Sequence, residues 1–132
     1  MKRTIELTVW FGLLLPLVFG QTTKSQVLSA AEAKQHVGES ATVCGKVVAA
    51  RISKYSVGRR GKPITFDLDE TAPKRVFTFI SWSPDPKTVE QTRDSYTGKN
   101  VCVSGTITRT GATPHMVVSD SSQIQVQTEG KN

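Results

Sequence analysis

Hydrophobic and polar residues alternate along several stretches of the chain, as they do in β-strands with one buried face. Between residues 64 and 69, for example, Ile64, Phe66 and Leu68 share one face and the intervening residues are polar. The stretch 75–82 is apolar on both faces, which predicts a strand with one face in the core and the other covered or used. The predicted strands are residues 40–51, 64–69, 75–82, 99–110 and 114–120, the last resuming at 122–127.

Two short helices are predicted beside these strands. Ser29 followed by Glu32 has the spacing of a capping box, and Gly38 supplies a stop, which together predict about two turns of helix. Residues 84–96 carry helix formers after two prolines and predict a short helix or an irregular crossing. Glycines recur inside the longest strands, where a small barrel must bend. The order of elements therefore predicts an all-β fold with short helices, a five-stranded Greek-key barrel of the OB type.

The N-terminus has the pattern of a secretory signal. Lys2 and Arg3 precede an apolar run at 7–19, which is shorter than the roughly 20 residues that span a bilayer. This pattern predicts a signal peptide and a secreted or periplasmic protein, with an uncleaved membrane anchor as the alternative. The expected organisation is a signal peptide at 1–20, an N-terminal segment with a short helix at 21–37, the barrel domain at 38–127 and a disordered tail at 128–132.

The composition is mildly basic and the chain is the size of one domain. It has 132 residues with 17 Lys and Arg against 11 Asp and Glu, a formal net charge of +6. A basic excess favours acidic partners, although here it is spread along the chain rather than gathered in a tail.

The two cysteines lie in similar strands. Val43 and Val101 precede Cys44 and Cys102, and both cysteines fall on the face opposite these valines. Adjacent strands in an oxidising compartment predict a Cys44–Cys102 disulfide, with two free thiols as the alternative. Two cysteines without nearby histidines fall short of a structural zinc site, so no metal and no cofactor is predicted.

A basic loop, "SVGRRGKP" at 56–63, joins the first two predicted strands. Gly58 and Gly61 let the backbone approach a ligand closely, and Tyr55 is a candidate for stacking on a base. The alternative is that the loop is simply solvated. The candidate anion-binding or nucleic-acid-binding residues are Lys54, Tyr55, Arg59, Arg60, Lys62, Arg75 and Arg109.

The third strand offers a candidate stacking platform in Phe77, Phe79 and Trp82, with a place in the core as the alternative. On the second strand, Asp67 and Asp69 face outward in the expected register, where they would repel phosphate. A register slip by one residue would instead turn Phe66 outward.

The indications of catalysis in the sequence are thin. The acidic cluster of Asp67, Asp69 and Glu70 lacks the spacing of a calcium loop, and no Ser-His-Asp or Cys-His arrangement is suggested. No enzymatic activity is therefore expected.

Three stretches, "ATVCGKVVAAR", "PITFDLDE" and "GKNVCVSGTITRTGATPHMVVSDSSQIQV", resemble the small stand-alone OB-fold domains of secreted bacterial proteins. More distantly they are similar to the OB domains attached to tRNA synthetases and helicases. The resemblance covers residues 38–126 and implies a nucleic-acid-binding barrel.

The expected function is a secreted binding module without catalysis. Its predicted ligand is single-stranded DNA or RNA, or another extended anion, held weakly and in a salt-dependent way. The alternative is an interaction module for a protein or glycan of the cell envelope.

Overall fold

The computed structural model describes residues 12–14, 16, 26–83 and 86–128, with the backbone alone at 86 and 87. The predicted signal peptide, apart from 12–14 and 16, lies outside these residues, as does the predicted tail beyond residue 128. Within the described part of the chain, no helix combines the length and the apolar character needed to cross a membrane.

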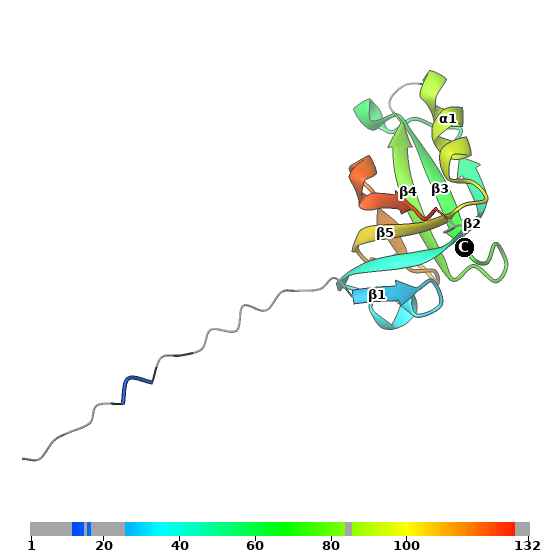
Figure 1. The fold of residues 1–132 in the computed structure, drawn as a ribbon. Helices are drawn as coiled ribbons and strands as arrows, with labels where there is room; N and C mark the ends of the chain where they lie inside the picture. The colour runs from blue at the N-terminus through cyan, green and yellow to red at the C-terminus, as the bar shows by residue number, and fades with distance from the viewer. Residues whose placement is uncertain (1–11, 15, 17–25, 84–85, 129–132) are drawn as a thin grey trace, which may run out of the picture.

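The described part of the chain is an all-β structure with one α-helix (Figure 1). Its strands are β1 (Gln26–Ser29), β2 (Ser40–Ile52), β3 (Lys62–Leu68), β4 (Phe77–Ser83), β5 (Asn100–Thr106), β6 (His115–Val117) and β7 (Ile124–Val126). The helix α1 spans Pro86–Tyr96, and the 3₁₀ helices are η1 (Ala33–Gln35), η2 (Gly58–Arg60) and η3 (Ser121–Gln123).

The hydrogen-bonded strand order is β6-β4-β3-β2-β5-β7, and β1 lies beside β2. The all-β class is thus confirmed, whereas the predicted strand count of five is corrected, because the structure has a seven-stranded sheet of open order. One additional strand, β1, pairs in parallel with residues 41–44 of β2. The predicted fifth strand is divided into β6 and β7, because Asp120 and Gln123 form a capping box that folds η3 between them.

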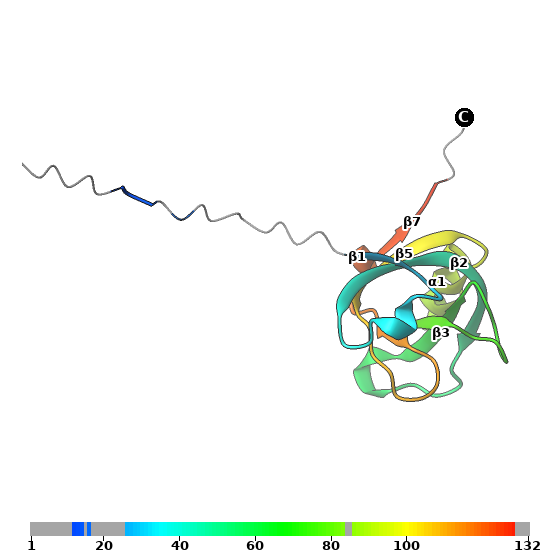
Figure 2. The ribbon, with the colours of Figure 1, turned by 90° about the horizontal axis from the view of Figure 1, so that it is seen from below.

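The long strand β2 joins the two parts of the sheet. Its first half pairs with β5 and β1, and after a register shift between Val47 and Ala49 its second half pairs with β3. A shift of this kind bends and twists a strand, which allows β2 to curve round the core. Figure 2 looks onto the end of the molecule at which η1 lies, and shows the strands curving past one another behind it.

The core lies between the inward faces of the strands. Ile64, Phe66 and Leu68 are fully buried, as their alternation predicts. Phe66 stacks on Phe79 of β4 with the ring centroids 4.7 Å apart, and Tyr96 of α1 meets Phe66 edge-on at 5.6 Å. Aromatic pairs of this geometry add to the stabilisation that burial provides. The helix α1 therefore closes one end of the core.

The prediction of a two-turn helix after Ser29 is wrong. The capping contacts do form, since the Glu32 backbone N donates to Ser29 Oγ at 3.3 Å and Ser29 Oγ donates to Glu32 Oε1 at 3.0 Å. Residues 26–29 are nevertheless held as a strand by β2, and the helical part is limited to the three residues of η1. Pairing with a strand distant in sequence has overridden the local signal.

The other predicted elements are confirmed, with shifted ends. The strand predicted at 40–51 is β2, and the helix predicted at 84–96 is α1. The strands predicted at 64–69, 75–82 and 99–110 are β3, β4 and β5, of which β5 ends four residues early at Thr106.

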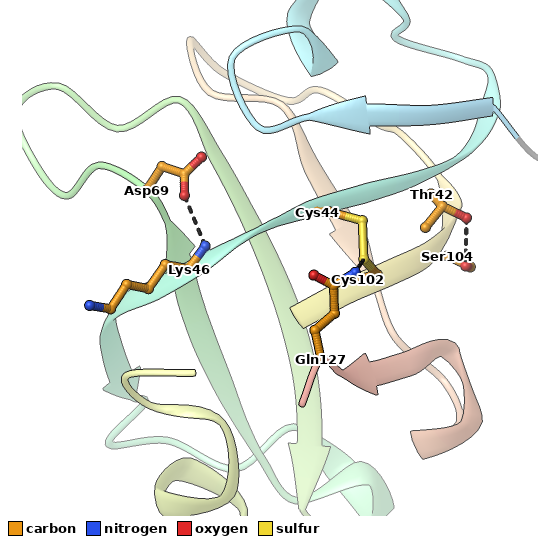
Figure 3. The surroundings of a disulfide bond; sticks show 7 residues. All are labelled: Thr42, Cys44, Lys46, Asp69, Cys102, Ser104 and Gln127. Carbon is orange, nitrogen blue, oxygen red and sulfur yellow. Dashed lines mark hydrogen bonds between the residues drawn. A yellow bond between two sulfur atoms is a disulfide. The ribbon is translucent and has the colours of Figure 1, made fainter. Parts of the chain in front are cut away.

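The predicted disulfide is confirmed (Figure 3). Cys44 and Cys102 lie directly opposite each other on β2 and β5, with an S–S distance of 2.05 Å. Gln127 Nε2 donates to Cys102 Sγ at 3.0 Å, and the hydroxyls of Thr42 and Ser104 hydrogen-bond at 2.8 Å on the same face. The bond therefore cross-links two strands that the core valines already hold together.

Candidate functional site

The outward-facing side chains of β3, β4 and β6 form one surface, which we call the outer face. Because Ile64, Phe66 and Leu68 point inward, their neighbours on β3 point the other way. The register places Thr65 beside Ile80, and Ile80 beside Val117 of β6. Pro63 pairs with Trp82 at the end of β4. Thr65, Ile80 and Trp82 are partly buried, so the outer face is a partly exposed strip that ends at Trp82.

The basic loop folds back beside this end of the face. The Val57 backbone N donates to Gly61 O at 2.9 Å, which closes the loop around η2. Gly58 and Gly61 have φ values of 51° and 82°, a region that residues with a side chain rarely adopt. The glycines expected to allow close approach to a ligand therefore also have a structural role, which is to turn the loop toward β4.

The loop brings two arginines to Trp82. The guanidinium carbon of Arg60 lies 5.7 Å from the centre of the Trp82 ring, a cation–π distance. Arg59, Arg60, Trp82, Val117 and Ser119 line a pocket of about 270 Å³, which we call the Trp82 pocket. Both arginines are exposed, so the pocket presents positive charge beside an aromatic ring.

The remaining predicted cations are not gathered in this pocket. Lys54 and Tyr55 are exposed on the same loop, Tyr55 by 80%, and Lys62 begins β3. Arg109 precedes β6, where its Nε donates to Gly111 O at 2.9 Å. Since β6 begins opposite Thr78, near the start of β4, Arg109 lies toward the opposite end of the face from η2.

Asp67 requires a correction to the predicted outer face. Its register does point it outward, but its side chain is fully buried rather than exposed. Asp67 Oδ1 lies 3.1 Å from Arg51 Nη2 and 3.0 Å from Arg75 Nε. Thr71 Oγ1 donates to Oδ2 at 3.1 Å. The carboxylate is therefore covered by its partners, and Arg75, predicted to bind an anionic ligand, is already paired with Asp67.

Asp69 is exposed but does not belong to the strip. It has a φ of 64° just beyond β3, and its Oδ1 accepts from the Lys46 backbone N at 2.8 Å (Figure 3). Its carboxylate thus ties the end of β3 to β2. Among the described residues, no group of three or more His, Cys, Asp or Glu is placed to hold a metal ion.

The stacking platform is also corrected. Phe77 and Phe79 are fully buried and belong to the core, because they alternate with the outward residues of β4. Trp82 lies in the opposite phase and is half-buried at the edge of the outer face. Of the three aromatic residues predicted to stack, Trp82 is the one that lines a pocket.

A second hollow lies on the other side of Trp82, between α1 and the residues that follow β6. We call this hollow, of about 340 Å³, the α1 cleft. It shares Trp82 and Ser119 with the Trp82 pocket. Its described lining is Ser81, Trp82, Thr88, Gln91, Thr92, Ser95, Tyr96, Val118, Ser119, Asp120 and Ser121. Sequence reasoning missed it, although Thr88, Thr92 and Ser95 recur at the spacing of one helix face.

No protein-family model matches the chain, and no curated protein matches it. Among solved structures, it is similar to a chain assigned as an aspartyl-tRNA synthetase from Leishmania major Friedlin, with a TM-score of 0.49 and 15% sequence identity. The match covers 89% of this chain and 24% of the other. Similarity at this level supports no conclusion about function.

Proposed function

We propose that this protein is a binding module without catalytic activity that holds an extended anion, such as single-stranded nucleic acid, at the outer face. The observation that carries the proposal is the Trp82 pocket, where the exposed Arg59 and Arg60 lie beside an aromatic ring. Cations that follow a polymer backbone, next to aromatic side chains, are the combination used by proteins that bind single strands. The net charge of +6 favours the same class of partner.

The order of the elements supports a partly open Greek-key barrel of the OB type. Three strands, β2 to β4, are followed by α1 and then by β5 and β6. The Thr108 and His115 backbones exchange two hydrogen bonds of 2.8 Å, which link the segment after β5 to β6. In this fold the second and third barrel strands and the first connecting loop border the ligand. These elements correspond to β3, β4 and the loop around η2.

The proposed location is the periplasm or the exterior of the cell. The disulfide supports this proposal, because such bonds persist in oxidising compartments. The signal-peptide pattern at residues 1–20 supports it independently.

The test is a fluorescence-anisotropy titration of the full chain with labelled single-stranded DNA and RNA oligomers and with polyphosphate, at 50 mM and 300 mM salt. If Arg59 and Arg60 each neutralise one phosphate, binding should weaken by about tenfold between the two salt concentrations. A protein partner held by apolar contacts would instead give binding that salt hardly changes.

A double variant, Arg59→Ala with Arg60→Ala, should lose most of this binding. The matched control, Lys34→Ala with Lys74→Ala, removes the same charge from exposed positions outside the pocket. Equal losses in both variants would indicate a general charge effect and no site. Unchanged affinity in the arginine variant would contradict the proposal.

A glycan of the cell envelope is the second candidate ligand. The observation that favours it is the α1 cleft, whose described lining is rich in hydroxyl groups.

A further inference from the structure

The α1 cleft and the Trp82 pocket lie side by side and share Trp82 and Ser119. We propose that the α1 cleft binds a neutral sugar ring of an acidic polysaccharide, while the adjacent acidic group of the same chain lies against Arg59 and Arg60. This inference rests on the proposed function, since it takes the extended anion to be a glycan.

The cleft presents the hydrogen-bonding groups that a sugar requires. Thr92 Oγ1 donates to Thr88 O at 2.8 Å, and Ser95 Oγ donates to Gln91 O at 2.7 Å. Each of these hydroxyls has thereby used its single hydrogen, and its oxygen is left as an acceptor. The Gln91 amide and the hydroxyl of Ser121 line the same cleft and are exposed. Sugar hydroxyls both donate and accept, so they match such a lining.

The charge of the cleft disfavours a phosphate. Asp120 belongs to the lining, and none of the lining residues that the structure describes is Lys or Arg. The hydrogen bond from the Ser122 backbone N to Asp120 Oδ1, at 2.8 Å, favours the charged carboxylate and lowers the pKa of Asp120. Asp120 is therefore an anion at neutral pH. A carboxylate of this kind can accept hydrogen bonds from the hydroxyl groups of a sugar, and its negative charge disfavours a phosphate.

The walls of the cleft suit a sugar ring better than a stacked nucleic-acid base. Tyr96 is fixed by its edge-on contacts with Phe66 and Phe79, at 5.6 and 6.4 Å. The guanidinium carbon of Arg60 lies 5.7 Å from the centre of the Trp82 ring, so a base stacking on that face of the ring would have to displace Arg60. The volume of about 340 Å³ is at the small end of ligand pockets.

The two hollows therefore differ in charge. The Trp82 pocket is cationic, and the α1 cleft beside it is anionic and rich in hydrogen-bond acceptors. A nucleic acid strand carries one phosphate for every nucleotide and would place a second phosphate near Asp120. A polysaccharide in which acidic and neutral sugars alternate places one charge against the arginines and one uncharged ring in the cleft. The arrangement favours the polysaccharide.

The experiment measures binding of the full chain to three labelled probes at 50 mM salt: a hyaluronate octasaccharide, in which uronic acid and N-acetylhexosamine alternate, a polyphosphate and an oligothymidylate. We expect the tightest binding with hyaluronate. A cleft variant, Gln91→Ala with Ser121→Ala, should bind hyaluronate about tenfold more weakly, because it loses two hydrogen bonds. It should bind polyphosphate as the unmodified chain does.

The matched control is Ser40→Ala with Gln125→Ala, which makes the same two changes at exposed positions of β2 and β7 outside the cleft. It should bind all three probes normally. Gln91 and Ser121 are exposed, so their truncation should leave folding intact, and circular dichroism of the variants checks this.

The outcomes distinguish failure of the sugar site alone from failure of both proposals. If polyphosphate binds through Arg59 and Arg60 while the cleft variant keeps full affinity for hyaluronate, the sugar site is wrong and the anion site stands. Tighter binding of oligothymidylate than of hyaluronate would also overturn the sugar site and favour nucleic acid. No binding of any probe would overturn both proposals.

Discussion

Replacing Asp67 tests how the outer face is held together. The side chain is fully buried, and its carboxylate faces two arginines and the hydroxyl of Thr71. The substitution Asp67→Ala would leave two guanidinium groups close together without their counter-ion. It would also remove the contact between β3 and the residues that lead into β4.

The expected loss of stability in Asp67→Ala depends on how exposed the two arginine partners of Asp67 are. Removing one member of a buried ion pair typically costs about 3–5 kcal/mol, because the other charge is left unpaired. Here the side chains of Arg51 and Arg75 are 50% and 24% exposed, so water partly compensates them. We therefore expect Asp67→Ala to lower the free energy of unfolding by about 3 kcal/mol, at the low end of that range. Asp67→Asn keeps an acceptor for Thr71 and should cost less, about 2 kcal/mol.

The assay is urea unfolding followed by far-ultraviolet circular dichroism, with thermal unfolding in parallel. For a domain of this size, a loss of 3 kcal/mol corresponds to a fall in Tm of roughly 12 °C. The matched control is Asp94→Ala, because Asp94 is 69% exposed and pairs with Arg93 at 3.0 Å. It should cost less than about 0.5 kcal/mol. Equal stability of the Asp67 and Asp94 variants would refute the reasoning that burial gives the Asp67 cluster its importance.

Three further predictions concern stability and titration. The two cysteines are 58 residues apart, so reduction of the disulfide should lower the free energy of unfolding by about 4 kcal/mol. Urea unfolding with and without dithiothreitol measures this loss, and an unchanged midpoint would contradict it. Gly45→Ala should lower the free energy of unfolding by about 1–2 kcal/mol, because the new Cβ would lie 2.9 Å from Asp69 Oδ1. In the control Gly111→Ala the new Cβ would lie in open space, and the stability should hardly change. Asp120 should titrate below its ordinary pKa of 3.8, because the hydrogen bonds from Ser122 favour its charged form. The stabilising effect of the charged carboxylate is then present above pH 3.8 and is lost as the pH falls through the lower pKa of the folded state. An NMR titration that gives a pKa of 3.8 or more would disprove this.

Much of the fold could be predicted from alternation alone. The inward set of Ile64, Phe66 and Leu68 is correct, and the valines beside the two cysteines are buried as expected. Alternation also puts Trp82 and Phe79 on opposite faces of β4, as in the structure, and this separation rules out the single stacking platform predicted for them. These predictions succeed because a period of two is a property of the strand itself and requires no knowledge of its neighbours.

The rest depended on contacts between residues far apart in the sequence. Residues 26–29 form a strand only because β2 offers them a free edge, which a local capping signal cannot reveal. The burial of Asp67 likewise depends on Arg51 from β2 and Arg75 from the loop before β4. The α1 cleft is built from α1, β4 and residues 118–121, and no single segment carries its pattern.

If the protein binds a polymer as proposed, the position of its charges, more than their number, decides which polymer it would hold. A chain leaving the Trp82 pocket along the outer face passes Ile80 and Thr65, which carry no charge. It meets the next cations only at the Asp67 cluster, four residues along β3, or about 13 Å away. There Asp67 offsets one of the two arginine charges. A chain leaving in the other direction enters a cleft that contains an ionised carboxylate. Because a uniformly charged strand would find no closely spaced cations in either direction, the proposed ligand with charges interrupted by neutral rings is a better match to both paths than a uniformly charged one.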